Sequence, residues 1–356
     1  MNFAIHRTRG FLSVARVAAT FLIAIISVAK ALTPPSETFH AVGTDSKGVA
    51  WRARLAEGEA LEVIGPRRFQ VKTAAPLDLF QVFGAIDSSD VVWIADFKGR
   101  GVRVKLADGS AEEFKVPISQ QLVGGIAVAD SHLYFGDSNA AGGTAVRRMN
   151  TASGATETLL EWDVKWQSPD LFPRKRHLWV ATAATPSPGK RKLELTALDW
   201  ATGKVARRGQ REMSLAAEQW LNFELAEAED GAAWVADGRS ARVEQLDDAG
   251  KWQDWSLDGL TPSNLVTASF GAACFLQQLK PPEPPPFPGA PQSPTVLRRE
   301  IAVFEPGATK LLTCPVETDV KLSTDSSGNV QVEGRGRLSI EGGRLRIVPD
   351  AASKSR

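Results

Sequence analysis

The sequence predicts an all-β fold, a seven-bladed β-propeller of four-stranded antiparallel blades. Three observations support this: a segment that recurs seven times, a spacing between copies that suits propeller blades, and turn residues where a four-stranded sheet needs them. Each full copy has an Asp, small or polar residues, two apolar residues, an aromatic residue and a short apolar run. Periods of about 40 to 50 residues that hold several short strands are typical of propeller blades.

The recurring aromatic position marks the phase of the repeat. It holds Trp51, Trp93, Tyr134, Trp179 and Trp234, and in two degenerate copies Cys274 and Gln331. Because it recurs within a strand, we expect this large side chain to fill the space between neighbouring blades rather than to stack on a ligand. The recurring Asp stands at the start of a turn, where its side chain can accept the turn's own N–H groups. We expect capping from it rather than metal binding.

The second copy shows the four strands most clearly, at 80–86, 91–95, 102–106 and 112–116. The segments between them read Asp-Ser-Ser-Asp, Lys-Gly-Arg-Gly and Ala-Asp-Gly, which are typical hairpin turns. The remaining copies repeat this plan with local enlargements. We expect a longer hairpin at 184–192 and a helical turn at 214–219.

The seven units fill residues 36–350 and leave no room for a second domain. The largest insertion, 280–294, is rich in Pro, which cannot donate a hydrogen bond to a sheet, so it predicts a stiff loop that protrudes from blade 6. Residues 351–356 are predicted to be a disordered tail. The sequence leaves open whether blades 1 and 7 close the ring by adjacency or by sharing a strand.

The first 31 residues differ from the rest of the chain. Basic residues precede an apolar run at 17–29, and Ala-Lys-Ala follows at 29–31. This order predicts a cleaved signal peptide, because the run is shorter than the roughly 20 residues that span a bilayer. We therefore expect a mature protein that is extracytoplasmic, periplasmic or secreted, with no membrane span. A net charge of +1 gives no argument for nucleic acid as a partner.

An oxidising compartment would allow the only two cysteines, Cys274 and Cys314, to pair. The repeat places them on the second and fourth strands of one blade. One strand between them would separate their Cα atoms by about 10 Å, too far for a disulfide. We predict two buried thiols.

Two blades carry a more specific pattern. Asp-Gly-Ala-Ala-Trp-Val-Ala-Asp at 230–237, followed by Arg-Val-Glu-Gln-Leu-Asp-Asp-Ala-Gly at 242–250, resembles the repeat of the streptogramin-lyase-like, two-component-regulator and NHL-type propellers. Residues 93–96 and 103–109 are similar to it. The resemblance implies the propeller fold, whereas the group contains lyases, lactonases, sensor ectodomains and interaction modules, so a function does not follow.

Lyases of that group use a His with a metal-binding acid nearby on the open face of the propeller. Here His132 and His177 each stand two residues before the aromatic position, where we expect histidines that flank a turn. His40 lies near the start of the innermost strand of blade 1, at the mouth of the channel. It is the one candidate for an acid or base.

Charge differs between the two faces of the predicted ring. The opposite turns are rich in Asp, whereas the face with the turns between second and third strands receives the candidate ligand-binding residues Lys98, Arg100, Lys190, Arg191, Arg239, Lys280 and Arg335. This predicts a monomeric, non-enzymatic module that needs no cofactor and binds an anionic small molecule, a glycan or an acidic protein surface. The alternative is a lyase or lactonase-type enzyme with a divalent cation at the channel mouth, using His40.

Overall fold

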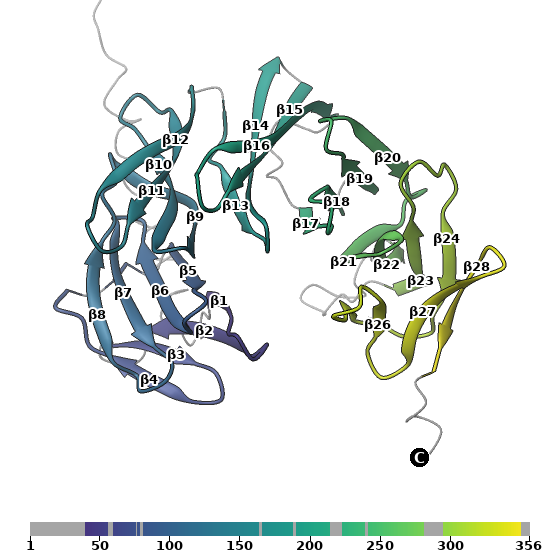
Figure 1. Cartoon of the computed structure of the whole chain (residues 1–356), viewed down its shortest axis with the longest axis horizontal. Helices are drawn as coiled ribbons and strands as arrows, with labels where there is room; N and C mark the ends of the chain where they lie inside the picture. Colours follow the sequence, from purple (N-terminus) through teal and green to yellow (C-terminus); the bar gives the residue numbers. More distant parts are fainter. Residues whose placement is uncertain are drawn as a thin grey trace, which may run out of the picture.

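The computed structural model describes residues 40–55, 60–75, 77–78, 81–163, 166–187, 190–213, 223–238, 241–280 and 295–349. These residues form seven four-stranded antiparallel sheets, each made of four consecutive strands. The sheets stand side by side around a common centre, and the first strand of each lies nearest to it (Figure 1). The predicted fold is confirmed.

The strands follow the predicted blades in order. Blades 1 to 3 consist of β1 (His40–Thr44), β2 (Ala50–Leu55), β3 (Leu61–Ile64) and β4 (Arg68–Val71); β5 (Val82–Ile86), β6 (Val91–Asp96), β7 (Arg100–Lys105) and β8 (Ala111–Lys115); and β9 (Gln121–Ala129), β10 (His132–Ser138), β11 (Thr144–Asn150) and β12 (Thr156–Trp162). All four strands predicted for blade 2 are therefore present, with bounds shifted by at most two residues.

Blades 4 to 7 complete the set. They consist of β13 (Asp170–Pro173), β14 (His177–Ser187), β15 (Lys190–Asp199) and β16 (Val205–Met213); β17 (Phe223–Glu227), β18 (Ala233–Asp237), β19 (Arg242–Leu246) and β20 (Trp252–Ser256); β21 (Thr261–Ala268), β22 (Gly271–Lys280), β23 (Thr295–Phe304) and β24 (Leu312–Pro315); and β25 (Leu322–Thr324), β26 (Val330–Val332), β27 (Gly336–Glu341) and β28 (Arg344–Val348). The long hairpin of blade 4 is present as predicted.

The core consists of apolar clusters between consecutive blades. In five of these clusters the repeat aromatic packs against the blade that follows its own; these residues are Trp51, Trp93, Tyr134, Trp179 and Trp234. The interpretation of the aromatic as packing between blades is therefore confirmed.

The turn Asp and the aromatic of the repeat are hydrogen-bonded to each other. One carboxylate oxygen of Asp45 accepts the backbone N–H groups of Lys47 and Val49 at 3.0 and 2.9 Å, and the other accepts the indole N–H of Trp51 at 2.9 Å. Asp87 accepts the indole N–H of Trp93 at the same distance. The Asp thus caps its turn, as predicted, and also fixes the orientation of the aromatic ring.

In blade 6 the residue predicted to match the repeat aromatic, Cys274, was wrong by one position. Cys274 packs against blade 5, whereas its neighbours Ala273 and Phe275 pack against blade 7. Side chains alternate along a strand, so Cys274 points opposite to the repeat aromatics. Both cysteines are free thiols on the predicted strands, β22 and β24; Cys274 is buried, but Cys314 is only partly buried.

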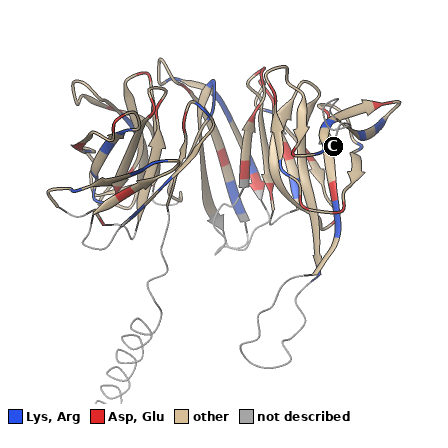
Figure 2. Cartoon of the chain, turned by 90° about the horizontal axis from the view of Figure 1, so that it is seen from below, with Lys and Arg blue, Asp and Glu red and all other residues tan. Residues whose placement is uncertain are grey.

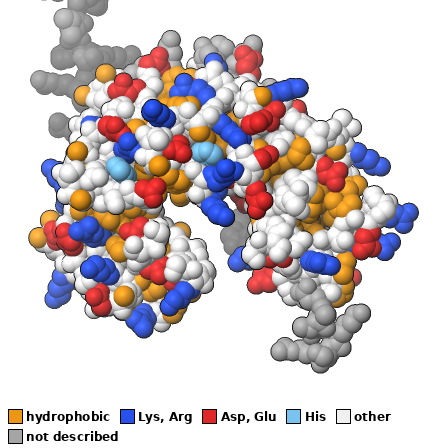
Figure 3. All heavy atoms as spheres, in the orientation of Figure 1, with side chains coloured by type: hydrophobic (Ala, Val, Ile, Leu, Met, Phe, Trp, Pro, Cys, Tyr) orange, Lys and Arg blue, Asp and Glu red, His pale blue; other side chains and the backbone are white. Residues whose placement is uncertain are grey.

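The ring is open between its first and last blades. Each apolar cluster found among the described residues joins blades that are consecutive in sequence, and none joins blade 7 to blade 1. Figure 1 shows the gap between the purple strands of blade 1 and the yellow strands of blade 7. The gap persists with all side chains drawn (Figure 3). Neither expected mode of closure is therefore present.

Several predicted segments lie outside the described residues: the signal peptide at 1–31, the helical turn at 214–219, most of the Pro-rich loop at 280–294, and the tail at 351–356. Within the described residues there is no helix that is long and apolar enough to cross a bilayer.

Candidate functional site

The first two predicted binding residues stand at the turn between β6 and β7, and both are paired with acids. Lys98 Nζ lies 3.2 Å from an oxygen of Asp78, and Arg100 donates two hydrogen bonds to Asp96, at 2.9 and 2.7 Å. Asp96 is fully buried and also accepts the backbone N–H groups of Lys98 and Arg100. Most of the positive charge here is therefore balanced by carboxylates that shape the turn.

The other predicted residues are dispersed. Arg191 is only 1% exposed, so it belongs to the interior and not to the surface of the basic face. Lys280 ends β22, and Arg335 donates a hydrogen bond to Thr318. The side chain of Lys190 and all of Arg239 lie outside the described residues. In the side view, acidic and basic residues lie close together along the central strands (Figure 2).

Charged groups from both blades are largely buried where blades 4 and 5 meet. Arg211 of β16 forms an ion pair with Glu244 of β19, and its guanidinium lies 5.3 Å from the ring centroid of Trp252. Burial raises the pKa of Glu244 to about 7 even though Arg211 lies beside it. These groups hold two blades together and are not available to a ligand.

One predicted residue does line a cavity. A cavity of about 400 Å³ lies between blade 2 and the segment that enters it, and its lining includes Arg100, Gly101, Phe114 and Lys115. Arg100 and Lys115 are direct partners on β7 and β8, so two cations lie at the same edge of the sheet. A Cβ at Gly101 would lie 2.4 Å from the ring of Phe114, so the ring covers this glycine. Lys115 was not among the predicted residues.

A larger cavity, about 610 Å³, lies between blades 2 and 3 near their first turns. Arg103 and Glu112, which both line it, form an ion pair at 2.5 Å, and Arg103 lies 5.4 Å from the ring centroid of Trp93. Asp87 and Asp130 add negative charge to the lining. This cavity therefore has no preference for one sign of charge.

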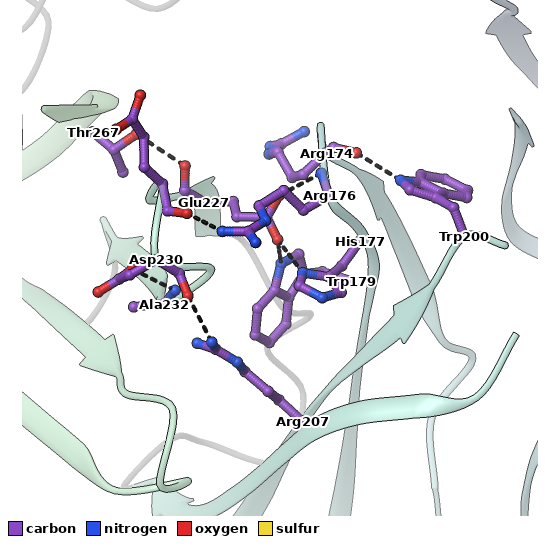
Figure 4. Close-up of polar contacts among 11 residues, drawn as sticks. Arg174, Arg176, His177, Trp179, Trp200, Arg207, Glu227, Asp230, Ala232 and Thr267 are labelled. Carbon is purple, nitrogen blue, oxygen red and sulfur yellow. Dashed lines mark hydrogen bonds and ion pairs between the residues drawn. The ribbon is translucent and has the colours of Figure 1, made fainter. Parts of the chain in front are cut away.

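A histidine and an acid, His177 of blade 4 and Glu227 of blade 5, form a contact between the two blades. His177 Nδ1 lies 2.5 Å from Glu227 Oε1, which also accepts the indole N–H of Trp179 at 3.0 Å. The second oxygen accepts the backbone N–H of Arg176 at 2.9 Å. Figure 4 shows His177 and Trp179 of the second strand of blade 4 directed at Glu227, with Arg176 just before that strand. Glu227 is 3% exposed and both oxygens are occupied, so the pair holds two blades together.

His132 and His177 lie next to turns, as predicted, and His40 begins the first strand of blade 1. His177 and His132 are the first residues of β14 and β10, next to turns, and His132 Nδ1 lies 2.8 Å from the carbonyl oxygen of Asp130. His40 is the first residue of β1 and is partly exposed. No group of three or more His, Cys, Asp or Glu side chains among the described residues could hold a metal ion, so the structure does not place His40 in such a group.

Asp170 is an acid that sequence reasoning missed. It begins β13, the innermost strand of blade 4, and burial raises its pKa to about 6. No motif surrounds it; the one local signal is Pro169 before it, which marks the start of a strand.

Comparison with known proteins supports the fold alone. No protein-family model and no curated protein matches the sequence. Among solved structures, a chain of hydrazine synthase from Kuenenia stuttgartiensis is similar over 90% of this chain and 99% of its own, with 12% identity and a TM-score of 0.50. A streptogramin B lyase matches 85% of this chain and 92% of its own, with 12% identity and a TM-score of 0.44.

A virginiamycin B lyase from Staphylococcus aureus matches 75% of this chain and 83% of its own, with 11% identity and a TM-score of 0.38. The seven four-stranded sheets make the chain a seven-bladed β-propeller, and its similarity to these solved structures is one of fold only.

Proposed function

We propose that the protein is an extracytoplasmic, non-enzymatic binding module that recognises an anionic group at the cavity lined by Arg100 and Lys115. The observation that carries this proposal is the pairing of these two cations across β7 and β8 at the edge of a cavity of about 400 Å³. The extracytoplasmic location rests on the predicted signal peptide. Arg100 is held by Asp96, and the lining acid Glu113 accepts the backbone N–H of Ala74, which leaves Lys115 as the cation open to a ligand. Such a cavity, with the ring of Phe114 beside it, suits a small carboxylate, phosphate or sulfate ester.

The proposal is also supported because the other buried titratable groups are engaged in contacts between blades. His177, Glu227, Arg211 and Glu244 form contacts between blades 4 and 5, which leaves them unsuited to proton transfer with a ligand. By contrast, Lys115 is exposed and no hydrogen bond or ion pair of its side chain is found among the described residues. A free ammonium group beside Arg100 is what an anionic ligand needs.

Titration calorimetry with citrate, inorganic phosphate and a sulfated disaccharide tests the proposal on residues 32–356. We expect Lys115→Glu to weaken binding of the best probe at least tenfold. Lys105→Glu is the matched control, because Lys105 lies at the other end of β7 and the change in net charge is the same. Equal binding by wild type and Lys115→Glu, or an equal loss in both variants, would contradict the proposal.

The second candidate is a metal-dependent lyase or lactonase-type enzyme. Asp170 favours it, because a carboxyl group with a pKa of about 6 on an innermost strand is suited to proton transfer near neutral pH. Its test is the melting temperature with EDTA and with added Ca²⁺, Mg²⁺ or Zn²⁺, for wild type and Asp170→Asn. A metal-dependent rise that Asp170→Asn abolishes would favour the enzyme over the binding module.

A further inference from the structure

Apart from Val348, the paired residues of blade 7 that point away from blade 6 are polar. Leu338, Ile340 and Leu345 pack against blade 6, and side chains alternate along a strand. The residues between and opposite them therefore point to the gap; they are Arg337, Ser339, Glu341, Arg344 and Arg346, together with Ser323 and Gln331 on β25 and β26. Blades 1 to 6 bury an apolar cluster against the blade that follows, so the polar free face of blade 7 suits a position with no blade after it.

Blade 1 is likewise mostly polar on its own free face, where Ile64 is paired with Arg52 and Arg68. Trp51, Ala53, Leu61 and Val63 pack against blade 2, so the alternate residues of β2, β3 and β4 face the gap. They include Arg52, Arg54, Glu62, Arg68 and Gln70. Glu62 is fully buried there because Arg54, Arg68 and Gln70 all donate hydrogen bonds to it and cover it.

The repeat aromatic explains why these two faces differ from the others. In blades 1 to 5 that residue packs on the following blade. In blade 7 the position holds Gln331, which faces the gap and donates its amide N–H to the turn residue Asp325 at 2.9 Å. This is the hydrogen bond that Trp51 makes with Asp45. Blade 6 also lacks the aromatic at this position but still packs on blade 7 through Ala273 and Phe275, whereas Gln331 of blade 7 has no following blade to contact.

Both free faces are positively charged. Each carries three arginines and one glutamate: Arg52, Arg54, Arg68 and Glu62 on blade 1, and Arg337, Arg344, Arg346 and Glu341 on blade 7. Arg52, Arg337, Arg344 and Arg346 are exposed and have no hydrogen-bond or ion-pair partner among the described residues. This concentration of charge contrasts with a net charge of +1 for the whole chain. The two faces repel each other, which opposes closure of the ring.

We propose that the gap between blades 1 and 7 binds an acidic segment of a partner protein. Guanidinium groups pair with carboxylates through two parallel hydrogen bonds, and the Ser and Gln side chains between them supply neutral donors and acceptors for a peptide backbone. A second copy of this chain would present the same arginine-bearing faces and be repelled. The site is separate from the cavity beside Lys115, so either proposal can fail alone.

The experiment compares two triple variants of residues 32–356 that change the net charge equally. Arg52→Glu/Arg337→Glu/Arg346→Glu alters the gap. Lys204→Glu/Lys251→Glu/Lys310→Glu alters exposed lysines of blades 4, 5 and 6. The probe is a fluorescent 20-residue poly-glutamate peptide, followed by anisotropy at low and physiological salt. We expect the gap variant to weaken binding at least tenfold and the lysine variant to change it less than threefold.

Three outcomes would overturn the proposal: no binding of poly-glutamate by wild type, equal losses in the two variants, or heparin binding more tightly at the gap than poly-glutamate. Sedimentation velocity of wild type and the gap variant tests whether a second copy of this chain occupies the gap instead of a partner protein. A dimer that only the gap variant abolishes would assign the gap to a second copy. Circular dichroism melting of both variants establishes that each is folded.

Discussion

Trp179 of blade 4 donates its indole N–H to Glu227 of blade 5 at 3.0 Å, whereas Trp51 and Trp93 donate to an aspartate in their own turns at 2.9 Å. The turn before Trp179 contains Arg176 and His177 in place of the repeat Asp. The acceptor that this turn lacks is therefore supplied by the next blade. A buried Trp needs a partner for its N–H, and here that need fixes two blades to each other.

Glu227→Ala should lower the free energy of unfolding by at least about 2 kcal/mol, because it leaves the N–H groups of Trp179 and Arg176 without acceptors. Urea denaturation measures the change. Glu229→Ala is the control, since Glu229 is exposed two residues away, and it should change stability by less than about 0.5 kcal/mol. Similar losses in both variants would contradict this role for Glu227.

Glu244→Gln should cost about 3 kcal/mol, because it leaves the charge of Arg211 buried without its partner. The double variant Arg211→Met/Glu244→Leu should recover most of that loss, since apolar residues of similar size avoid the cost of burying two charges. Thermal denaturation of the wild type and both variants provides the comparison. A double variant no more stable than Glu244→Gln would show that the ion pair itself stabilises this interface.

Exchanging the residues of the repeat aromatic position tests the open ring. Trp51→Gln should cost at least about 3 kcal/mol, because Trp51 fills the space between blades 1 and 2. Gln331→Trp should change stability by less than about 0.5 kcal/mol, and the new indole should show the red-shifted fluorescence of an exposed ring. A blue-shifted, stabilising Trp at 331 would mean that blade 7 packs on blade 1 in solution.

Acid should destabilise the protein partly through Glu62. Hydrogen bonds from Arg68 and Gln70 lower the pKa of Glu62 from 4.5 to about 2. A lowered pKa in the folded state gives stability that is complete above pH 4.5 and is lost as the pH falls towards 2. Glu62→Gln should therefore flatten the loss of stability across this range, measured by urea denaturation. Glu112→Gln alters an exposed ion pair with Arg103. It should leave the decrease in the free energy of unfolding over this pH range as it is in the wild type.

The two thiols should differ in reactivity. Burial raises the pKa of Cys274 well above its usual range, and Cys274 has no exposed surface. Cys314 is only partly buried. Ellman's reagent should modify Cys314 slowly and Cys274 only after denaturation, with Cys314→Ser abolishing the reaction of the native protein. A reactive native thiol in Cys314→Ser would show that blade 6 opens readily.

The fold could be predicted from the sequence because its signals are local. The Asp, the turn glycines and the aromatic lie within a few residues of each other and recur, so seven blades and most of their turns were identified correctly. Cys274 was misplaced because the first turn of blade 6 is shorter, and a shift of one residue on a strand reverses the side chain.

The site was harder to predict because charge balance depends on contacts between distant residues. Lys98 and Arg100 were correctly placed at one turn, yet nothing local shows that Asp78 and Asp96 pair with them. Arg191 was predicted to be on the surface because it follows a turn, but the folded chain leaves only 1% of it exposed. The polar face of blade 7 did have a sequence signal, the strict alternation of Arg, Leu, Ser and Ile at 337–340 and the Gln at 331.

A ring that does not close is, in terms of connectivity, a row with two ends. Blades 1 and 7 each have one neighbour while the other five have two, so the energetics should follow those of a linear repeat array. Opening of an end blade breaks one interface instead of two. Hydrogen exchange should accordingly be fastest in the first and last blades and slowest in the middle ones, and unfolding should spread inward from the ends.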